Sequence, residues 1–313
     1  RSFTLVAGAP TLGHIPRDQL YQRVLPGQIH VFGGKPYQVD AVDEAAGVVR
    51  LHHRAGTDRA TNRPDLRIDV GPLRALRDAD DTRALGLGWT ARAILAEAVV
   101  EIETPGFFAF RDGIHLAQAS YSYTALNGPN ATPARRYDQA RVLRLTFTPE
   151  GNATPPPDPD RLAFTLALLL TEALPTLFPE AHAFVRVGTA PSLVGPLADL
   201  MPRFSIEGDD MAAISLTVVE DAHADLGLVQ ALFDTWPQVF TLLGAYASWL
   251  FENDAQSDGE WTVASLDPLD FLRYGLDQVP DVLDLEGAAS FLHELMPPSL
   301  NERTQSRWRF YGR

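Results

Sequence analysis

A buried strand that ends in carboxylates and continues as a long helix is the feature that most constrains this sequence. Met211–Val219 is almost wholly apolar, which is typical of a central strand. The acidic turn Glu220–Asp225 follows it, and from Leu228 to Phe251 large apolar residues recur at three- and four-residue spacing, which predicts a helix. A turn between such a strand and helix is a common place for a metal ion, a phosphate or a partner. No complete catalytic motif accompanies it in the sequence.

The charge of the chain is divided unevenly between its two halves. The first 150 residues carry 18 basic and 16 acidic side chains, whereas the remaining residues carry 8 basic and 24 acidic ones. The second half therefore has a net charge of −16 and repels a phosphate backbone. Contact with DNA is expected through the first half or the C-terminal tail.

The residue types that are missing exclude several classes of site. The sequence has no cysteine, which excludes disulfides, thiolate zinc sites and iron–sulfur clusters. No cofactor is predicted. The longest apolar run, Leu162–Leu174, is too short to span a bilayer, and no signal peptide opens the chain. We therefore expect a cytoplasmic protein that does not contact membranes.

A proline-rich segment marks the expected domain boundary. Three consecutive prolines and a fourth close by, within residues 150–160, favour a stiff and extended connector. The chain length of 313 residues fits two domains of roughly 150 residues each. The predicted organisation is a β-rich, barrel-like domain over 1–150, a linker over 151–160 and a helix-rich α+β domain over 161–313. The predicted fold class is α+β.

Short alternating runs separated by turn signals predict a meander of strands in the first domain. The runs are Gln28–Phe32, Lys35–Ala41 and Gly47–His53. Gly33 and Gly34 form a typical hairpin turn between the first two. A short helix is predicted over Leu73–Ala84. Further strands are expected at Ile94–Glu103, Phe107–Phe110, Ala119–Leu126 and Arg141–Thr148, with a loop over Asn127–Ala134.

Apolar periodicity predicts a helix-rich second domain. The expected helices are Arg161–Phe178, Leu228–Phe251, Pro268–Leu276 and Leu285–Leu295, and the expected strands are Ala183–Val187 and Ile214–Val219. Pro175 is expected to kink or end the first helix, and Pro237 to kink the second or mark the start of another.

The segment Leu20–Val39 carries a recognisable pattern. It contains Leu20-Tyr21, then Pro26-Gly27, then two alternating apolar runs around Gly33-Gly34. Glu103–Phe108 matches a later strand of the same pattern more loosely. Together with the order of the helices and strands, these segments resemble the C-terminal accessory region of superfamily 2 DNA helicases of the bacterial mitomycin-repair helicase type and their fungal relatives. The resemblance covers about Pro16–Asp254.

This resemblance implies an accessory module that works with a helicase motor or another protein partner in DNA repair or phage defence. The sequence departs from the family at its last module, which binds zinc through four cysteines that this chain lacks. It also contains no phosphate-binding Gly-x-x-x-x-Gly-Lys-Ser/Thr loop, and Lys35 precedes a proline instead of opening a helix. We therefore expect no ATP hydrolysis and no catalytic residues in this chain.

The acidic turn supports three readings. Glu220, Asp221, His223 and Asp225 combine carboxylates and an imidazole, which suits a Mg²⁺ or Mn²⁺ site or a general acid–base pair in a metal-dependent hydrolase or nuclease. Alternatively, Asp225 caps the following helix, and the other carboxylates are stabilised by the positive end of the helix dipole. A third possibility is contact with a protein partner, in which the acidic second half acts as an interaction scaffold.

Arginines next to aromatic rings are the candidate nucleic-acid-binding residues, because guanidinium groups contact phosphates and rings stack on bases. They form two groups, Arg135, Arg136 and Arg141 beside Tyr137, and Arg303, Arg307, Trp308 and Arg309 in the tail. The alternative is a solvated loop and a docked tail. His52 and His53 are consecutive on a strand and are predicted to point to opposite faces. By pattern, the strands of the first domain carry few exposed aromatic residues.

Overall fold

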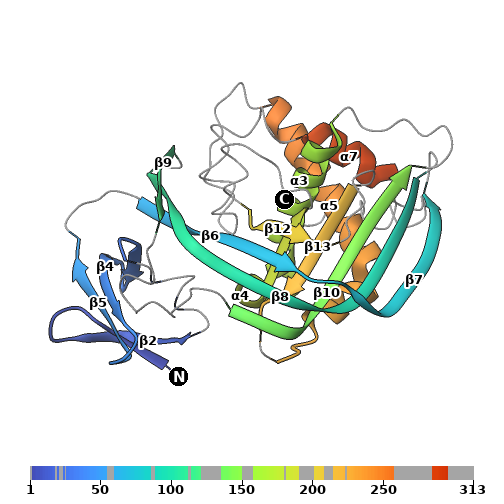
Figure 1. The fold of residues 1–313 in the computed structure, drawn as a ribbon. Helices are drawn as coiled ribbons and strands as arrows, with labels where there is room; N and C mark the ends of the chain where they lie inside the picture. Colours follow the sequence, from blue (N-terminus) through green and yellow to red (C-terminus); the bar gives the residue numbers. More distant parts are fainter. Residues whose placement is uncertain are drawn as a thin grey trace. The chain divides into compact units, whose positions relative to one another are not determined.

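The computed structural model describes residues 2–17, 20, 24, 26–54, 60–85, 89–111, 114–120, 135–149, 158–179, 181–189, 201–207, 214–222, 224–256 and 284–294. They form two compact units, Arg1–Ile68 with Glu101–Arg136, and Asp69–Val100 with Tyr137–Arg313. Strands fill the N-terminal part of the sequence and the long helices follow (Figure 1), which confirms the α+β class. Residues 151–157 of the predicted linker lie outside the described residues.

The first unit contains a curled five-stranded sheet with the order β2-β1-β5-β4-β3 (Figure 1). Its strands are β1 (Ser2–Val6), β2 (Thr11–Pro16), β3 (Ile29–Phe32), β4 (Lys35–Asp43) and β5 (Val48–His53). Neighbouring strands are antiparallel except β1 and β5, which are parallel. Alternate residues such as Phe3, Leu5, Val49 and Leu51 face inward and form a small core with Phe107.

The three strands predicted around the glycine turns are confirmed. Gly33 and Gly34 have φ angles of 54° and 77°, so the β3–β4 turn uses the left-handed conformations that glycine adopts without a steric penalty. In the next turn the Gly47 N–H donates to the Asp43 carbonyl at 2.9 Å, and the Asp43 side chain accepts from the Ala46 N–H. Strands β1 and β2 were not predicted; Gly13 interrupts the apolar alternation of β2.

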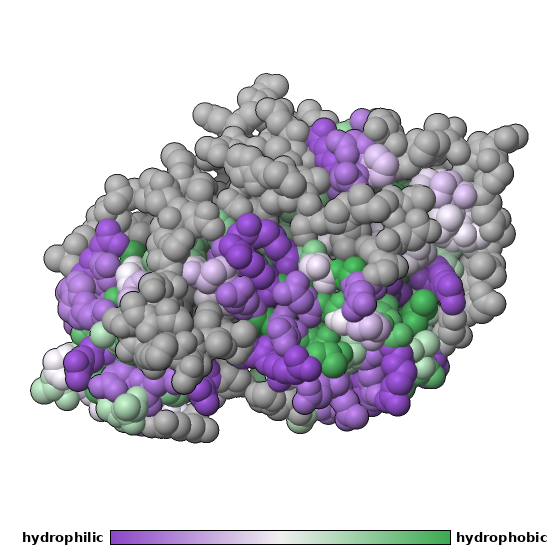
Figure 2. Space-filling model, in the orientation of Figure 1, coloured by the Kyte–Doolittle hydropathy of each residue, from purple (hydrophilic) through white to green (hydrophobic). Residues whose placement is uncertain are grey.

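The larger sheet has eight strands, in the order β11-β13-β10-β8-β6-β12, with β7 and β9 also paired to β8. The strands are β6 (Ala60–Val70), β7 (Arg74–Leu85), β8 (Trp89–Arg111), β9 (Ile114–Ser120), β10 (Arg135–Pro149), β11 (Val185–Thr189), β12 (Arg203–Ile206) and β13 (Ile214–Glu220). The two strands predicted within residues 94–110 are parts of the continuous strand β8. Figure 2 shows hydrophobic residues bordered by hydrophilic ones on the visible surface.

The helix predicted over Leu73–Ala84 is wrong, because all of these residues except Leu73 belong to strand β7. The segment is rich in arginine, alanine and leucine, which are good helix formers. However, β7 is hydrogen bonded to β8 from Arg74 opposite Glu97 to Leu85 opposite Trp89, and this tertiary pairing overrides local propensity.

Helices pack on the larger sheet within the second unit. They are α3 (Pro159–Leu177), α4 (Ala181–Phe184), α5 (Leu228–Gln256) and α7 (Leu285–Glu294). Asp158 caps α3 by accepting the Arg161 N–H at 3.0 Å. Phe147 of β10 contacts Phe240 of α5 and Phe291 of α7, with ring centroids 5.6 and 5.4 Å apart, so both helices share one core with the sheet. The long helices predicted around residues 161–178, 228–251 and 285–295 are confirmed.

Both prolines lie inside helices. Pro175 lies near the end of α3, which continues to Leu177, and α5 runs through Pro237. The segments Asn127–Ala134 and Pro268–Leu276 lie outside the described residues, as does most of the strand predicted over Ala119–Leu126. None of the described helices is long and apolar enough to cross a membrane.

Candidate functional site

The first carboxylate of the acidic turn, Glu220, is buried at the end of β13. Its side chain accepts hydrogen bonds from the backbone N–H groups of Leu226 and Val229, which precede and open helix α5. Burial raises the pKa of Glu220 above its usual value, although these two hydrogen bonds oppose the increase. Glu220 therefore satisfies amide groups at the start of α5 from inside the domain.

The second carboxylate, Asp221, joins three strands of the larger sheet. It accepts a hydrogen bond from the Tyr137 hydroxyl of β10 at 2.6 Å, and its Oδ2 lies 3.0 Å from Nη2 of Arg186 on β11. The Asp221 N–H also donates to the Phe184 carbonyl. The side chains of Arg186 and Asp221 are only 10% and 1% exposed, so this ion pair is removed from water.

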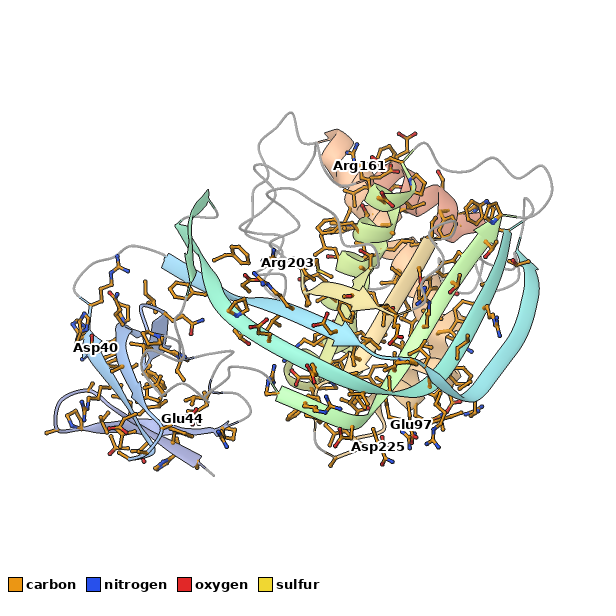
Figure 3. All side chains as sticks on the ribbon, in the orientation of Figure 1. Asp40, Glu44, Glu97, Arg161, Arg203 and Asp225 are labelled. Atoms are coloured by element: carbon orange, nitrogen blue, oxygen red, sulfur yellow. The ribbon has the colours of Figure 1, made fainter. Side chains whose placement is uncertain are left out.

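Asp225 lies on the surface and contacts Arg141 of β10. The Arg141 Nε donates to Asp225 Oδ2 at 2.7 Å, and the Gly227 N–H donates to Asp225 Oδ1 at 2.9 Å. The hydrogen bond from Arg141 lowers the pKa of Asp225, against a smaller opposing effect of burial. Arg141 also pairs with Glu97 of β8, which in turn pairs with Arg74 of β7. Figure 3 shows Glu97 and Asp225 close together.

The structure thus brings Glu220, Asp221 and Asp225 into one region but gives each a different structural partner. Near the start of the helix, Asp225 accepts a hydrogen bond from the Gly227 N–H only. Glu220 accepts hydrogen bonds from the N–H groups of Leu226 and Val229. The residues that the structure describes contain no group of three histidine or acidic residues able to hold a metal ion, and His223 lies outside them. In the described geometry these carboxylates hold the turn, the helix and the sheet together.

We expect Asp225→Asn to lower the free energy of unfolding by about 1 kcal/mol at pH 7, because asparagine is neutral and loses the ion pair with Arg141. The effect is small because Asp225 is 46% exposed and salt screens it. Since folding lowers the pKa of Asp225, its contribution is full above the usual value of 3.8 and is lost as the pH falls through the lowered pKa. Urea unfolding at pH 7, 5 and 3 measures this loss.

The control for this prediction is the same substitution in an Arg141→Met background. There the guanidinium is gone, so the Asp225→Asn difference should be much smaller and should depend less on pH. An equal difference at pH 7 and pH 3 in the wild-type background would contradict the assignment.

The predicted arginines of β10 differ in their surroundings. Arg136 is 59% exposed and pairs with Glu101 of β8, which is itself 47% exposed. Arg141 is only 25% exposed and lies between the carboxylates of Glu97 and Asp225. The charge of Arg141 is therefore largely offset, while Arg136 remains accessible. Arg135 begins β10 beside Arg136. The tail residues Arg303, Arg307, Trp308 and Arg309 lie outside the described residues.

The structure also assembles a surface that the sequence analysis missed. Phe32 and Tyr37 of its sheet are half-buried and pack against the core, so they do not contradict the expectation of few exposed aromatic residues in the first domain. Four rings lie partly or fully exposed on β3, β4 and β5, namely His30, Phe32, Tyr37 and His53. Tyr37 and His53 meet edge to face at 5.5 Å, Phe32 and Tyr37 at 6.1 Å, and His30 stacks on Phe32 at 5.3 Å.

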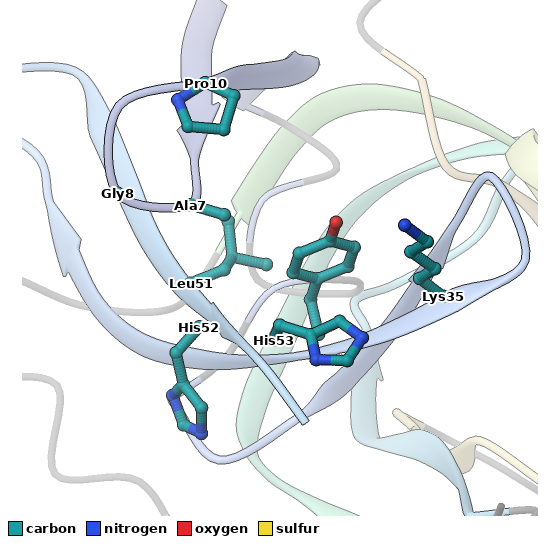
Figure 4. Close-up of a pocket in the computed structure, with 8 residues that line it drawn as sticks. Ala7, Gly8, Pro10, Lys35, Leu51, His52 and His53 are labelled. Carbon is teal, nitrogen blue, oxygen red and sulfur yellow. The ribbon is translucent and has the colours of Figure 1, made fainter. Parts of the chain in front are cut away.

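Two of these rings, Tyr37 and His53, line a pocket of about 490 Å³, which we call the barrel-mouth pocket. It is lined by Ala7, Gly8, Pro10, Lys35, Tyr37, Leu51, His52 and His53 (Figure 4). Lys35 and His53 border the same space in Figure 4, whereas the His52 ring points away from it. His52 pairs with Asp40, at 2.6 Å, so the predicted opposite orientation of the two histidines is confirmed. The register of the β3–β4 and β4–β5 pairings, had it been known, would have shown that His30, Tyr37 and His53 lie on one face of the sheet.

The sequence matches no protein-family model and no curated protein. The fold is similar to crystal structures of the DUF1998 helicase MrfA, at 10% identity. A structure of this helicase without DNA aligns over 94% of this chain with a TM-score of 0.49. A structure of the helicase bound to DNA aligns over 95% of this chain with a TM-score of 0.42. The chain spans about a third of the helicase, 34% in both cases. Likenesses this distant do not define an activity.

Proposed function

We propose that this chain is a non-catalytic accessory module of a helicase-like DNA-processing machine in DNA repair or phage defence, and that it binds DNA. The observation that supports this best is a contact between the two segments that carry the family resemblance. Gly27, from the first segment, has a φ angle of 90°, and a Cβ at this position would lie 3.3 Å from Cζ of Phe107 in the second. Segments far apart in sequence thus meet in one core.

The hydrogen bonds of the first segment fit the same interpretation. The Gly27 N–H donates to the Val39 carbonyl and the Val39 N–H donates to the Gln28 carbonyl, both at 2.8 Å. The Pro-Gly pair therefore leads directly into the β3–β4 hairpin. A module built in this way positions a binding surface, while the ATP-driven step belongs to the motor with which it works.

Charge favours the first half of the chain as the DNA-binding side. Residues 151–313 carry a net charge of −16, whereas residues 1–150 carry +2. Arg135 and Arg136 lie side by side at the start of β10, and the Arg136 side chain is 59% exposed. The Arg136 guanidinium suits contact with a phosphate, whereas Nε and Nη2 of Arg135 are buried.

The test is binding of labelled single- and double-stranded DNA, measured by fluorescence anisotropy across a salt series. Arg136→Ala should weaken binding several-fold and make the slope of log K against log salt shallower by roughly 0.9, as expected for one lost duplex contact. Arg17→Ala is the matched control, because Arg17 is 61% exposed and also pairs with a carboxylate, Glu44. It should leave binding unchanged.

A chain that binds neither form of DNA at low salt would overturn the DNA-binding proposal. The strong negative charge of residues 151–313 would then favour the second candidate, an acidic scaffold that docks a basic surface of the motor or of another protein. Its association with a purified motor subunit should weaken as salt is raised.

A further inference from the structure

We propose that the barrel-mouth pocket holds one nucleotide of a single DNA strand, with its base against Tyr37 and His53 and its phosphate on Lys35. This inference rests on the proposed DNA-binding function and names the place and the form of DNA that it recognises. Single-stranded nucleic acids are bound by such combinations of aromatic rings and a positive charge, since rings stack on bases of any sequence.

The strand register places the necessary side chains on one face of the sheet. His30 lies opposite Tyr37, and Tyr37 lies opposite His53. Directly opposed residues share a face, as do residues two apart along a strand, so Lys35 joins Tyr37 on β4 and Phe32 joins His30 on β3. The ring surface is therefore built by the pairing of three strands, and the β1–β2 connection forms the other side of the pocket.

The size and the edges of the pocket suit a base with its sugar phosphate. A volume of about 490 Å³ falls within the usual range for small-molecule sites. On the side of the β1–β2 connection, Gly8 has a φ angle of 67°, and no atom lies within 4 Å of the Cβ position. Leu51 and Ala7 provide apolar contacts, which suits the face of a base.

The charge of the pocket favours an anion. Lys35 is the only lysine of the sequence, and it lies exposed on the pocket edge. None of the described residues that line the pocket is acidic. The nearby carboxylate of Asp40 is hydrogen bonded to His52, whose ring points away from the pocket in Figure 4. A phosphate near Lys35 therefore meets a local positive charge, although the chain as a whole is acidic.

The single lysine makes a direct test possible. The chain is treated with an amine-acetylating reagent, with and without an oligothymidylate of about twelve nucleotides, and acetylation of Lys35 is measured by mass spectrometry. A bound strand should reduce this acetylation several-fold, and high salt should restore it. Thymidine monophosphate, at the same nucleotide concentration, is the second ligand, because it carries the same base and phosphate. Equal protection by the mononucleotide would assign the pocket to free nucleotides and overturn the strand proposal.

Substitutions separate the two contacts. Lys35→Ala should make the salt slope for the oligonucleotide shallower by roughly 0.7, as expected for one lost single-strand phosphate contact. Tyr37→Leu, which keeps an apolar side chain beside the core, and His53→Ala should each weaken binding, Tyr37→Leu by about five- to 150-fold, with little change in slope. His14→Ala is the matched control, since His14 is an exposed histidine on β2 of the same sheet and does not line the pocket.

The outcomes distinguish this inference from the function on which it rests. Oligonucleotide binding that is unaffected by Lys35→Ala, Tyr37→Leu and His53→Ala, with Lys35 still reactive, would overturn the pocket but leave DNA binding intact. No binding of either DNA form at low salt would overturn both. Circular dichroism of each variant shows whether a loss of binding comes from unfolding.

Discussion

Replacing Asp221 with alanine should destabilise the second unit by about 3–5 kcal/mol, the cost typical of removing one partner of a buried ion pair. The side chain of Arg186 is 10% exposed and would lose the carboxylate 3.0 Å from it. Tyr137 would also lose the acceptor for its hydroxyl. Urea unfolding followed by tryptophan fluorescence measures the effect, because Trp89 and Trp236 are buried in the core of this unit.

A double-substitution cycle separates the ion pair from the general cost of burial. Asp221→Leu combined with Arg186→Met removes both charges, so the double variant should be more stable than Asp221→Leu alone. If Asp221→Ala cost less than about 1 kcal/mol, the pair would not hold the strands together as the geometry indicates.

Replacing Gly188 with alanine should cost about 3 kcal/mol, the upper end of the usual range for overpacking a core. Gly188 is buried on β11, and a Cβ there would lie 2.2 Å from Cδ2 of the Phe204 ring on β12. Phe204 is itself buried, so its ring cannot move away without disturbing its neighbours. The same urea unfolding experiment measures the loss.

Two further variants make this prediction specific. Gly13→Ala is the control, since no atom lies within 4 Å of the Cβ position at Gly13, a strand residue in the first unit. It should change stability little. Phe204→Leu should partly restore the stability of Gly188→Ala, because the smaller side chain leaves room for the new methyl group. Wild-type stability in Gly188→Ala would show that the ring does not pack against residue 188.

Elements whose determinants are local in the sequence could be predicted. The β3–β4 hairpin follows from two glycines with positive φ between alternating runs, and α3 follows from an apolar run that begins next to the cap Asp158. In contrast, β7 contains good helix formers and is a strand only because β8 pairs with it. That partner lies in another part of the sequence, and nothing in residues 74–85 identifies it.

The same distinction applies to the candidate sites. The acidic turn was visible in the sequence because its carboxylates are close along the chain, but their partners Tyr137, Arg186 and Arg141 come from distant strands. The barrel-mouth pocket was missed because Tyr37 and His53 belong to different strands and meet only after pairing. A correct register for the predicted meander would have placed Tyr37 beside His53.

The parallel pairing of β1 with β5 has a consequence for the order of folding. The β1–β2 hairpin can form locally, because its two strands are close in sequence. The other edge of β1 is paired only after β5 has formed, since Thr4 lies opposite Val48. Such non-local pairing slows folding, because the intervening chain must be closed into a loop first. Gly8 and His53, which both line the barrel-mouth pocket, are brought together by this late step. A ligand that occupies the pocket would therefore stabilise the closed sheet by mass action, and the binding surface exists only once the sheet is complete.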